Sequence, residues 1–228
     1  MSYLDDFDAW KDAIEAVPQE KVKPPNQPVD DFVAKTETLA VDAAEDREAL
    51  QGAGMNENLI DELTPLSGAL RYCQAKWMSE YRARVEAQKQ WKEQAPQAYA
   101  LRDELLHHFS FAYRNHDDII KKVRRIREGA SHADMIQDLI ELAVLGEKYP
   151  EPLTTINLEP DLLPQARTVS HSMSELLAAA NGADGEGSAN KLLRDKAFTL
   201  LFEKDSKVRE YGRYVFWKDE DKRSKYYK

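Results

Sequence analysis

Residues 98–128 read AYALRDELLHHFSFAYRNHDDIIKKVRRIRE. One set of mostly apolar residues recurs every three or four positions through this stretch, at Ala98, Leu101, Leu105, Phe109, Ala112, His116, Ile119, Val123 and Ile126. That spacing keeps side chains on one face of an α-helix. The opposite face is charged, and such a helix buries its apolar face against other helices. The stretch therefore predicts a long central helix in a helical bundle.

The rest of the chain supplies further helices and no sheet. Similar apolar faces recur in six other segments, at residues 4–17, 32–50, 66–91, 135–145, 162–180 and 193–215. Nine glycines in 228 residues, with few runs of valine, isoleucine or threonine, are not typical of strands. We predict an all-α protein, an up-and-down antiparallel bundle of about six to seven helices with long central helices.

Pro96 separates the central helix from the one before it. Either the proline kinks one very long helix, or the chain turns at Gln94–Ala95 and Pro96 opens the return helix. A continuous helix from Pro65 to Glu128 would be roughly 96 Å long, which is too long for one compact domain of this size. We therefore favour a hairpin at Pro96.

Proline and glycine suggest three parts in the chain. Four prolines between residues 18 and 28 preclude a helix there, so residues 1–28 are predicted to be an arm made of a short helix and an extended connector. Residues 29–217 are predicted to form the bundle, with an exposed loop at the glycine-rich run 182–188. Residues 218–228 are predicted to be a charged, frayed tail.

The charge is acidic and uneven. The net charge is −9, and residues 1–63 alone hold 16 acids against 5 bases. This argues against nucleic-acid binding over the whole surface and favours a solvated acidic face. The N-terminus lacks the basic start and apolar run of a signal peptide, and no segment approaches the ~20 apolar residues that span a bilayer. We expect a cytoplasmic protein without a membrane partner, and one cysteine, Cys73, rules out an internal disulfide.

His116 is the most informative polar residue, because it falls on the apolar face of the predicted central helix. A buried histidine needs a hydrogen-bond partner. We favour a core histidine with a hydrogen-bond partner, or an apolar face that nears the surface at this point. The alternative is a ligand or general base in a polar pocket between helices.

Two short patterns suggest metal binding. Glu104 and His107 match the Glu-x-x-His element of ferritin-like di-iron bundles, but a second such element is missing. His116–Asp117 resembles the metal-binding pair of helical phosphohydrolases, but His107 and His108 lie on the same predicted helix as the pair rather than on another helix. We predict no metal and no cofactor. A metal-binding enzyme or carrier centred on Glu104, His107 and His116 remains the alternative.

Two basic segments stand out against the acidic average. Residues 114–128 hold six bases and three acids, and residues 207–228 hold eight bases and four acids interleaved with aromatic residues. Bases with aromatics are typical of single-stranded nucleic-acid binding, and also of protein interfaces. We predict an interaction surface at the C-terminal end of the last long helix: Tyr211, Arg213, Tyr214, Phe216 and Trp217.

These features favour a non-catalytic interaction or scaffold protein over an enzyme. The partner would be another protein or a second copy of the chain, as in a homodimer. Nucleic-acid binding through the basic and aromatic C-terminus is a second alternative, which the acidic net charge disfavours.

Overall fold

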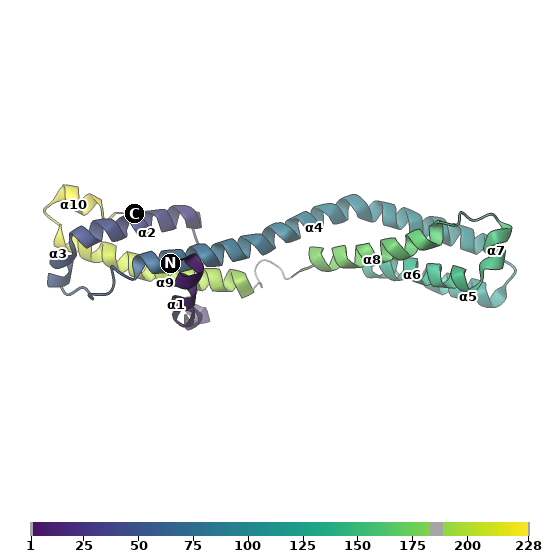
Figure 1. Ribbon diagram of the computed structural model, residues 1–228, viewed down its shortest axis with the longest axis horizontal. Coiled ribbons are helices and arrows are strands. Elements are labelled where there is room, and N and C mark those ends of the chain that lie inside the picture. The colour runs from purple at the N-terminus through teal and green to yellow at the C-terminus, as the bar shows by residue number, and fades with distance from the viewer. Residues whose placement is uncertain (1, 183–188, 228) are drawn as a thin grey trace. The chain divides into compact units, whose positions relative to one another are not determined.

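The chain is all-α, as predicted. A computed structural model describes residues 2–182 and 189–227, and neither range contains a β-strand (Figure 1). The described helices are α1 (Tyr3–Glu15), α2 (Val29–Glu45), α3 (Arg47–Gly52), α4 (Leu63–Ala112), α5 (Asp117–Ile126), α6 (His132–Lys148), α7 (Pro150–Thr155), α8 (Leu162–Ala180), α9 (Ala189–Val215) and α10 (Glu220–Ser224), with a short 3₁₀ turn at Gln19–Lys21. The loop predicted at 182–188 falls almost wholly outside the described residues.

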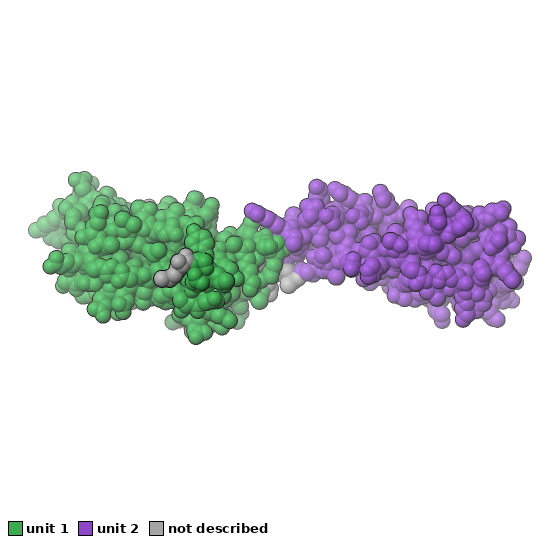
Figure 2. All heavy atoms as spheres, in the orientation of Figure 1, with its two compact units in different colours: residues 1–81, 183–228 green, residues 82–182 purple. Residues whose placement is uncertain are grey.

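The chain divides into two compact units, each with its own apolar core (Figure 2). Unit 1 comprises Met1–Tyr81 and Ala183–Lys228, and unit 2 comprises Arg82–Gly182. The residues predicted as a single bundle, 29–217, are therefore shared between the two units. Helix α4 contributes its first part to unit 1 and its second part to unit 2.

Helix α1 packs in the core of unit 1. Ser2 and Asp5 form a capping box at its start, which satisfies two backbone N–H groups. Phe7 lies 5.1 Å from the ring of Tyr72, and Ile14 is fully buried. The proline-rich connector is tied down as well, because the backbone N–H of Lys23 donates to the hydroxyl of Thr199.

Further buried contacts join α2 and α9 in unit 1. The rings of Phe32 and Phe198 lie 5.0 Å apart. The hydroxyl of Thr36 donates to buried Asp205, which also accepts from Arg209 at 2.9 Å. Cys73, the single cysteine, is only 1% exposed in the same core.

The prediction of a frayed tail at 218–228 is wrong for the described part of that segment. Asp219 caps α10, and Tyr226 beyond it is fully buried. The ring of Tyr226 lies against Gly212, where a Cβ atom would overlap it, and its hydroxyl donates to Asp46 at 2.9 Å. The missing side chain of Gly212 makes room for an aromatic ring, so the charged segment folds back onto α9.

The core of unit 2 combines residues of α4, α5, α6 and α8. Its fully or almost fully buried members include Leu105, Phe109, Val123, Met135, Leu139 and Ala166. Helix α6 begins with a capping box between Ser131 and Asp134, as the sequence suggests. Its neighbour α8 is held by the hydroxyl of Ser170, which donates to the carbonyl of Ile136.

The hairpin predicted at Pro96 is wrong. Helix α4 runs without interruption from Leu63 to Ala112 and contains Pro96. A long continuous helix does not fit within a single compact domain, but α4 contributes to two units. Pro96 is exposed, so no side chain packed around it is disturbed.

The continuous central helix predicted at 98–128 is also wrong. The chain leaves the helix at Tyr113 and starts α5 at Asp117. Tyr113 is fully buried, and its hydroxyl donates to the carbonyl of Tyr149 at 2.8 Å. This tertiary contact anchors the break, which no glycine or proline marks.

Candidate functional site

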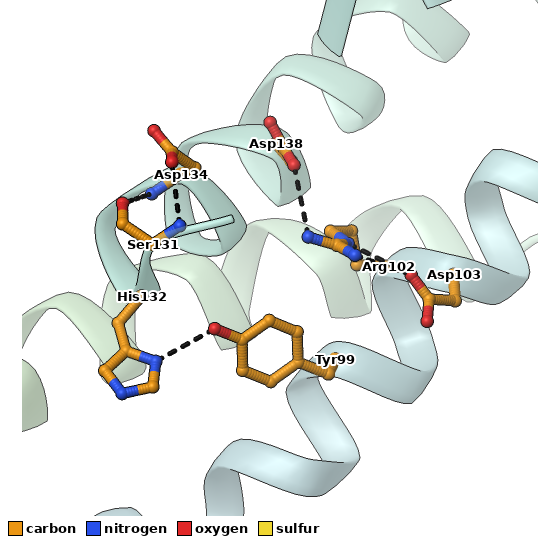
Figure 3. Close-up of polar contacts among 7 residues, drawn as sticks. All are labelled: Tyr99, Arg102, Asp103, Ser131, His132, Asp134 and Asp138. Atoms are coloured by element: carbon orange, nitrogen blue, oxygen red, sulfur yellow. Dashed lines mark hydrogen bonds and ion pairs between the residues drawn. The ribbon is translucent and has the colours of Figure 1, made fainter. Parts of the chain in front are cut away.

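A polar cluster lies between α4 and α6 of unit 2 (Figure 3). The hydroxyl of Tyr99 and Nδ1 of His132 are 2.9 Å apart, and the guanidinium of Arg102 lies 5.3 Å from the Tyr99 ring centre. The ring of His132 also makes an edge contact with Trp91, with ring centres 4.8 Å apart. These contacts join the two helices through side chains that carry both charge and aromatic surface.

Asp138 is the buried titratable group of this cluster. It is 5% exposed, and its Oδ2 makes an ion pair with Arg102 at 3.6 Å but no hydrogen bond (Figure 3). Arg102 is shared with Asp103 at 2.8 Å. Burial raises the pKa of Asp138 to about 6, against the opposing effect of Arg102. One carboxyl here can therefore exchange a proton in a weakly acidic range.

The sequence holds a signal for Asp138 that our interpretation missed. Asp138 lies three residues after Met135 and four before Leu142, both fully buried on α6. An acid at this spacing faces the core and needs a partner. Asp138, Tyr99 and His132 do not line the groove between α5 and α6 that is described below. The cluster links α4 to α6.

The structure does not bring the predicted metal ligands together. Glu104 and His107 are exposed, and the nearest partner of Glu104 is His108, 3.9 Å away on the same helix. His116 is exposed at the N-cap of α5, not in the core, because the helix break moves it off the apolar face. Among residues 2–182 and 189–227, no group of three or more histidine, cysteine, aspartate or glutamate side chains could hold a metal ion.

The predicted C-terminal interaction surface separates into two sets. Tyr211 donates to the carbonyl of Gly54, Arg213 donates to the carbonyl of Tyr226, and Phe216 stacks on the ring of Tyr226. These three residues therefore serve the fold of unit 1. Tyr214 and Trp217 project into solvent, with 71% and 64% of their surface exposed.

Three cations of residues 207–228 form ion pairs with acids of unit 1. Arg209 binds Asp205, Lys222 binds Asp46 at 2.6 Å, and Lys225 binds Asp42 at 3.2 Å. A cation held by an aspartate is less available to a phosphate. Arg209, Lys222 and Lys225 thus bind the chain's own acids.

The cations of α5 are arranged differently. Five bases fall within residues 121–127, with no acid among them. Lys121, Arg124, Arg125 and Arg127 are exposed, and none has an ion-pair partner in the described parts of the chain. The apolar positions Val123 and Ile126 are buried, which fixes the basic face outward.

Comparison with protein-family models, curated proteins and solved structures finds no match to this chain. No helix of the described residues combines the length and apolar character needed to cross a membrane.

Proposed function

We propose that this chain is a non-catalytic interaction or scaffold protein, which binds a partner protein through Tyr214 and Trp217. The observation that carries the proposal is exposure. These are the two most exposed aromatic side chains among the described residues. Tyrosine and tryptophan are the residue types that most often dominate protein-interface energies.

The backbone around the pair supports a preformed binding surface. Tyr214 and Trp217 are three residues apart, close to one helical turn, and the N–H of Phe216 still bonds to the carbonyl of Gly212. Arg223 donates to the carbonyl of Trp217, and the Tyr226 ring packs behind Phe216. A surface fixed in this way loses little conformational freedom when a partner binds.

The surroundings of the pair favour a protein partner. The ammonium group of Lys218 lies 4.7 Å from the Trp217 ring centre, so a cation borders the aromatic surface. Aromatic anchors with a charged rim are typical of protein interfaces. The buried carboxyl of Asp138 lies in interhelical packing and lines none of the described hollows, which favours binding over catalysis.

The test compares wild type with the double variant Tyr214→Ala/Trp217→Ala. Each purified chain is immobilised and exposed to a lysate of the source cells, and proteins retained by wild type alone are purified. Direct titration calorimetry then measures their affinity. We expect at least one protein that binds wild type and loses on the order of tenfold or more in affinity with the double variant.

The control is Phe111→Ala, which removes another exposed aromatic ring from α4 in unit 2. It should leave the affinity unchanged. Circular dichroism checks that all three chains are equally helical. A partner that binds the double variant as tightly as wild type, or the absence of any retained protein, would contradict the proposal.

A further inference from the structure

Helices α5 and α6 border an open groove on unit 2 with a basic rim and an apolar floor. Its volume is about 340 Å³. Its charged lining consists of three cations, Lys122, Arg125 and Lys148, and one acid, Glu141. The floor includes Ile126, Ile140 and Val144. Val144 is 50% exposed although it is aliphatic, so the floor can still bury apolar surface.

The three cations of the groove have no ion-pair partner in the described residues. Lys122 and Lys148 lie 5.3 Å and 5.6 Å from the ring centre of Tyr149, which holds their charges at the rim. Lys121, Arg124 and Arg125 extend the basic surface along the exposed side of α5. An occupant must therefore be anionic and must also present an apolar side chain.

The chain itself carries such a surface on α1. Asp5, Asp8, Asp12 and Glu15 are all exposed and recur at helical spacing. The first and last of these acids are ten helical steps apart, which is roughly 15 Å along the helix. None of them has an ion-pair partner in the described chain, and Leu4 is exposed beside Asp5 and Asp8. On α1, acids without ion-pair partners lie beside an exposed leucine. They therefore complement the groove, where cations without ion-pair partners lie beside an exposed valine.

A phosphate backbone fits the groove less well. It would use the cations but not the apolar floor at Ile140 and Val144. It would also meet a chain with a net charge of −9. A protein surface that is both acidic and apolar uses both features.

We infer that the α5–α6 groove binds the acidic face of α1 from a second copy of the chain. The inference goes beyond the proposed function, because it concerns a different surface from that of Tyr214 and Trp217. The two surfaces differ, so two copies exchange the contact reciprocally in a two-fold dimer, or successive copies repeat it head to tail in a ring or a filament. Attraction between these exposed charges weakens as salt screens them.

The first experiment is sedimentation velocity on the full chain over a range of concentrations, at about 50, 150 and 500 mM salt. Wild type should associate at low salt and dissociate at high salt. Lys121→Glu/Arg124→Glu/Arg125→Glu and Asp8→Lys/Asp12→Lys/Glu15→Lys should each weaken association on the order of tenfold or more. The matched control, Lys89→Glu/Lys92→Glu, reverses two exposed cations of unit 2 outside the groove and should associate like wild type.

The decisive measurement mixes the two charge-reversed variants. The reversed α5 of one variant is then complementary to the reversed α1 of the other, so the mixture should form a complex that neither variant forms alone. A monomeric wild type at every concentration, equal weakening by the control, or failure of the mixture to associate would overturn the inference.

A second arm tests the competing occupant. A fluorescently labelled single-stranded DNA is titrated with wild type and with the α5 variant. Salt-sensitive DNA binding that the α5 variant loses, together with no self-association, would overturn the inference in favour of nucleic acid. Neither arm alters Tyr214 or Trp217, so failure of the inferred self-association is distinguishable from failure of the proposed function.

Discussion

At the scale of single residues, Asp134 and Asp138 lie one helical turn apart on α6, and their pKa values are shifted in opposite directions. Burial raises the pKa of Asp138 to about 6. Hydrogen bonds from Ser131 lower the pKa of Asp134. The native state therefore holds a proton on Asp138 more tightly than the unfolded chain does, and a proton on Asp134 less tightly.

The first prediction concerns the free energy of unfolding of Asp138→Asn. A raised pKa means that the contribution of Asp138 to stability is present below pH 4 and is lost as pH rises to about 6. A shift of roughly two pH units corresponds to about 3 kcal/mol. The free energy of unfolding of Asp138→Asn minus that of wild type should therefore increase by up to about 3 kcal/mol from pH 4 to pH 7.5. Urea unfolding at the two pH values measures it.

Asp134→Asn is the control, because its effect on the free energy of unfolding should change with pH in the opposite direction. Because the pKa of Asp134 is lowered, its contribution is present above its unfolded pKa and is lost as pH falls. This variant should lose stability relative to wild type as pH rises through the acidic range. Two variants with the same pH trend would contradict the assignment.

Residue roles were only partly predictable from the sequence. Cys73 is buried, as its place in an apolar face indicates. His116 is exposed. Its predicted place on the apolar face required a continuous helix, and the helix is interrupted between Ala112 and Asp117. Side chains that are recruited by distant segments, such as Tyr226 by Gly212 and Asp46, have no local signal.

At the scale of elements, the docking of α10 on α9 depends on Gly212. We predict that Gly212→Ala lowers the stability of unit 1 by about 2 kcal/mol or more, because a Cβ atom would overlap the Tyr226 ring. Thermal unfolding followed by circular dichroism measures the change. Gly52→Ala is the matched control: its Cβ would meet nothing within 4 Å, and it should leave the melting temperature unchanged or slightly higher. Equal melting temperatures for Gly212→Ala and wild type would contradict this account.

Helix existence was predictable from apolar spacing, but helix boundaries were not. Proline within a helix interior is rare because it removes one backbone hydrogen bond, yet α4 contains Pro96. Conversely, α4 and α5 are separate although the apolar spacing continues across residues 113–116. Tertiary contacts such as that between Tyr113 and Tyr149 decide these points, and the spacing alone does not contain them.

At the scale of the whole molecule, the two cores belong to different parts of the chain. Every buried apolar residue of the second cluster lies between Ala87 and Ala180, inside the continuous range of unit 2. Apolar spacing identifies which residues are buried, but it cannot tell whether two buried faces share one core. This is why the sequence suggested one bundle over 29–217.

We predict that the fragment 82–182 folds on its own. It should be helical and should melt cooperatively, because its core needs no residue from unit 1. Circular dichroism with a thermal ramp measures this. Leu105→Ala in the fragment removes a fully buried side chain and should lower its stability by about 2–5 kcal/mol. A fragment without a cooperative transition would contradict the independence of the two cores.

The reactivity of Cys73 can be used to measure how often the core of unit 1 opens. It is the single cysteine of the chain, it lies within the core of unit 1, and burial raises the pKa of its thiol to about 12. A thiol reagent added to the native protein can therefore react only through conformations in which that core has opened. With a chromogenic thiol reagent, the rate of the absorbance change then reports how often unit 1 opens. No engineered label is needed, and unit 2 gives no signal.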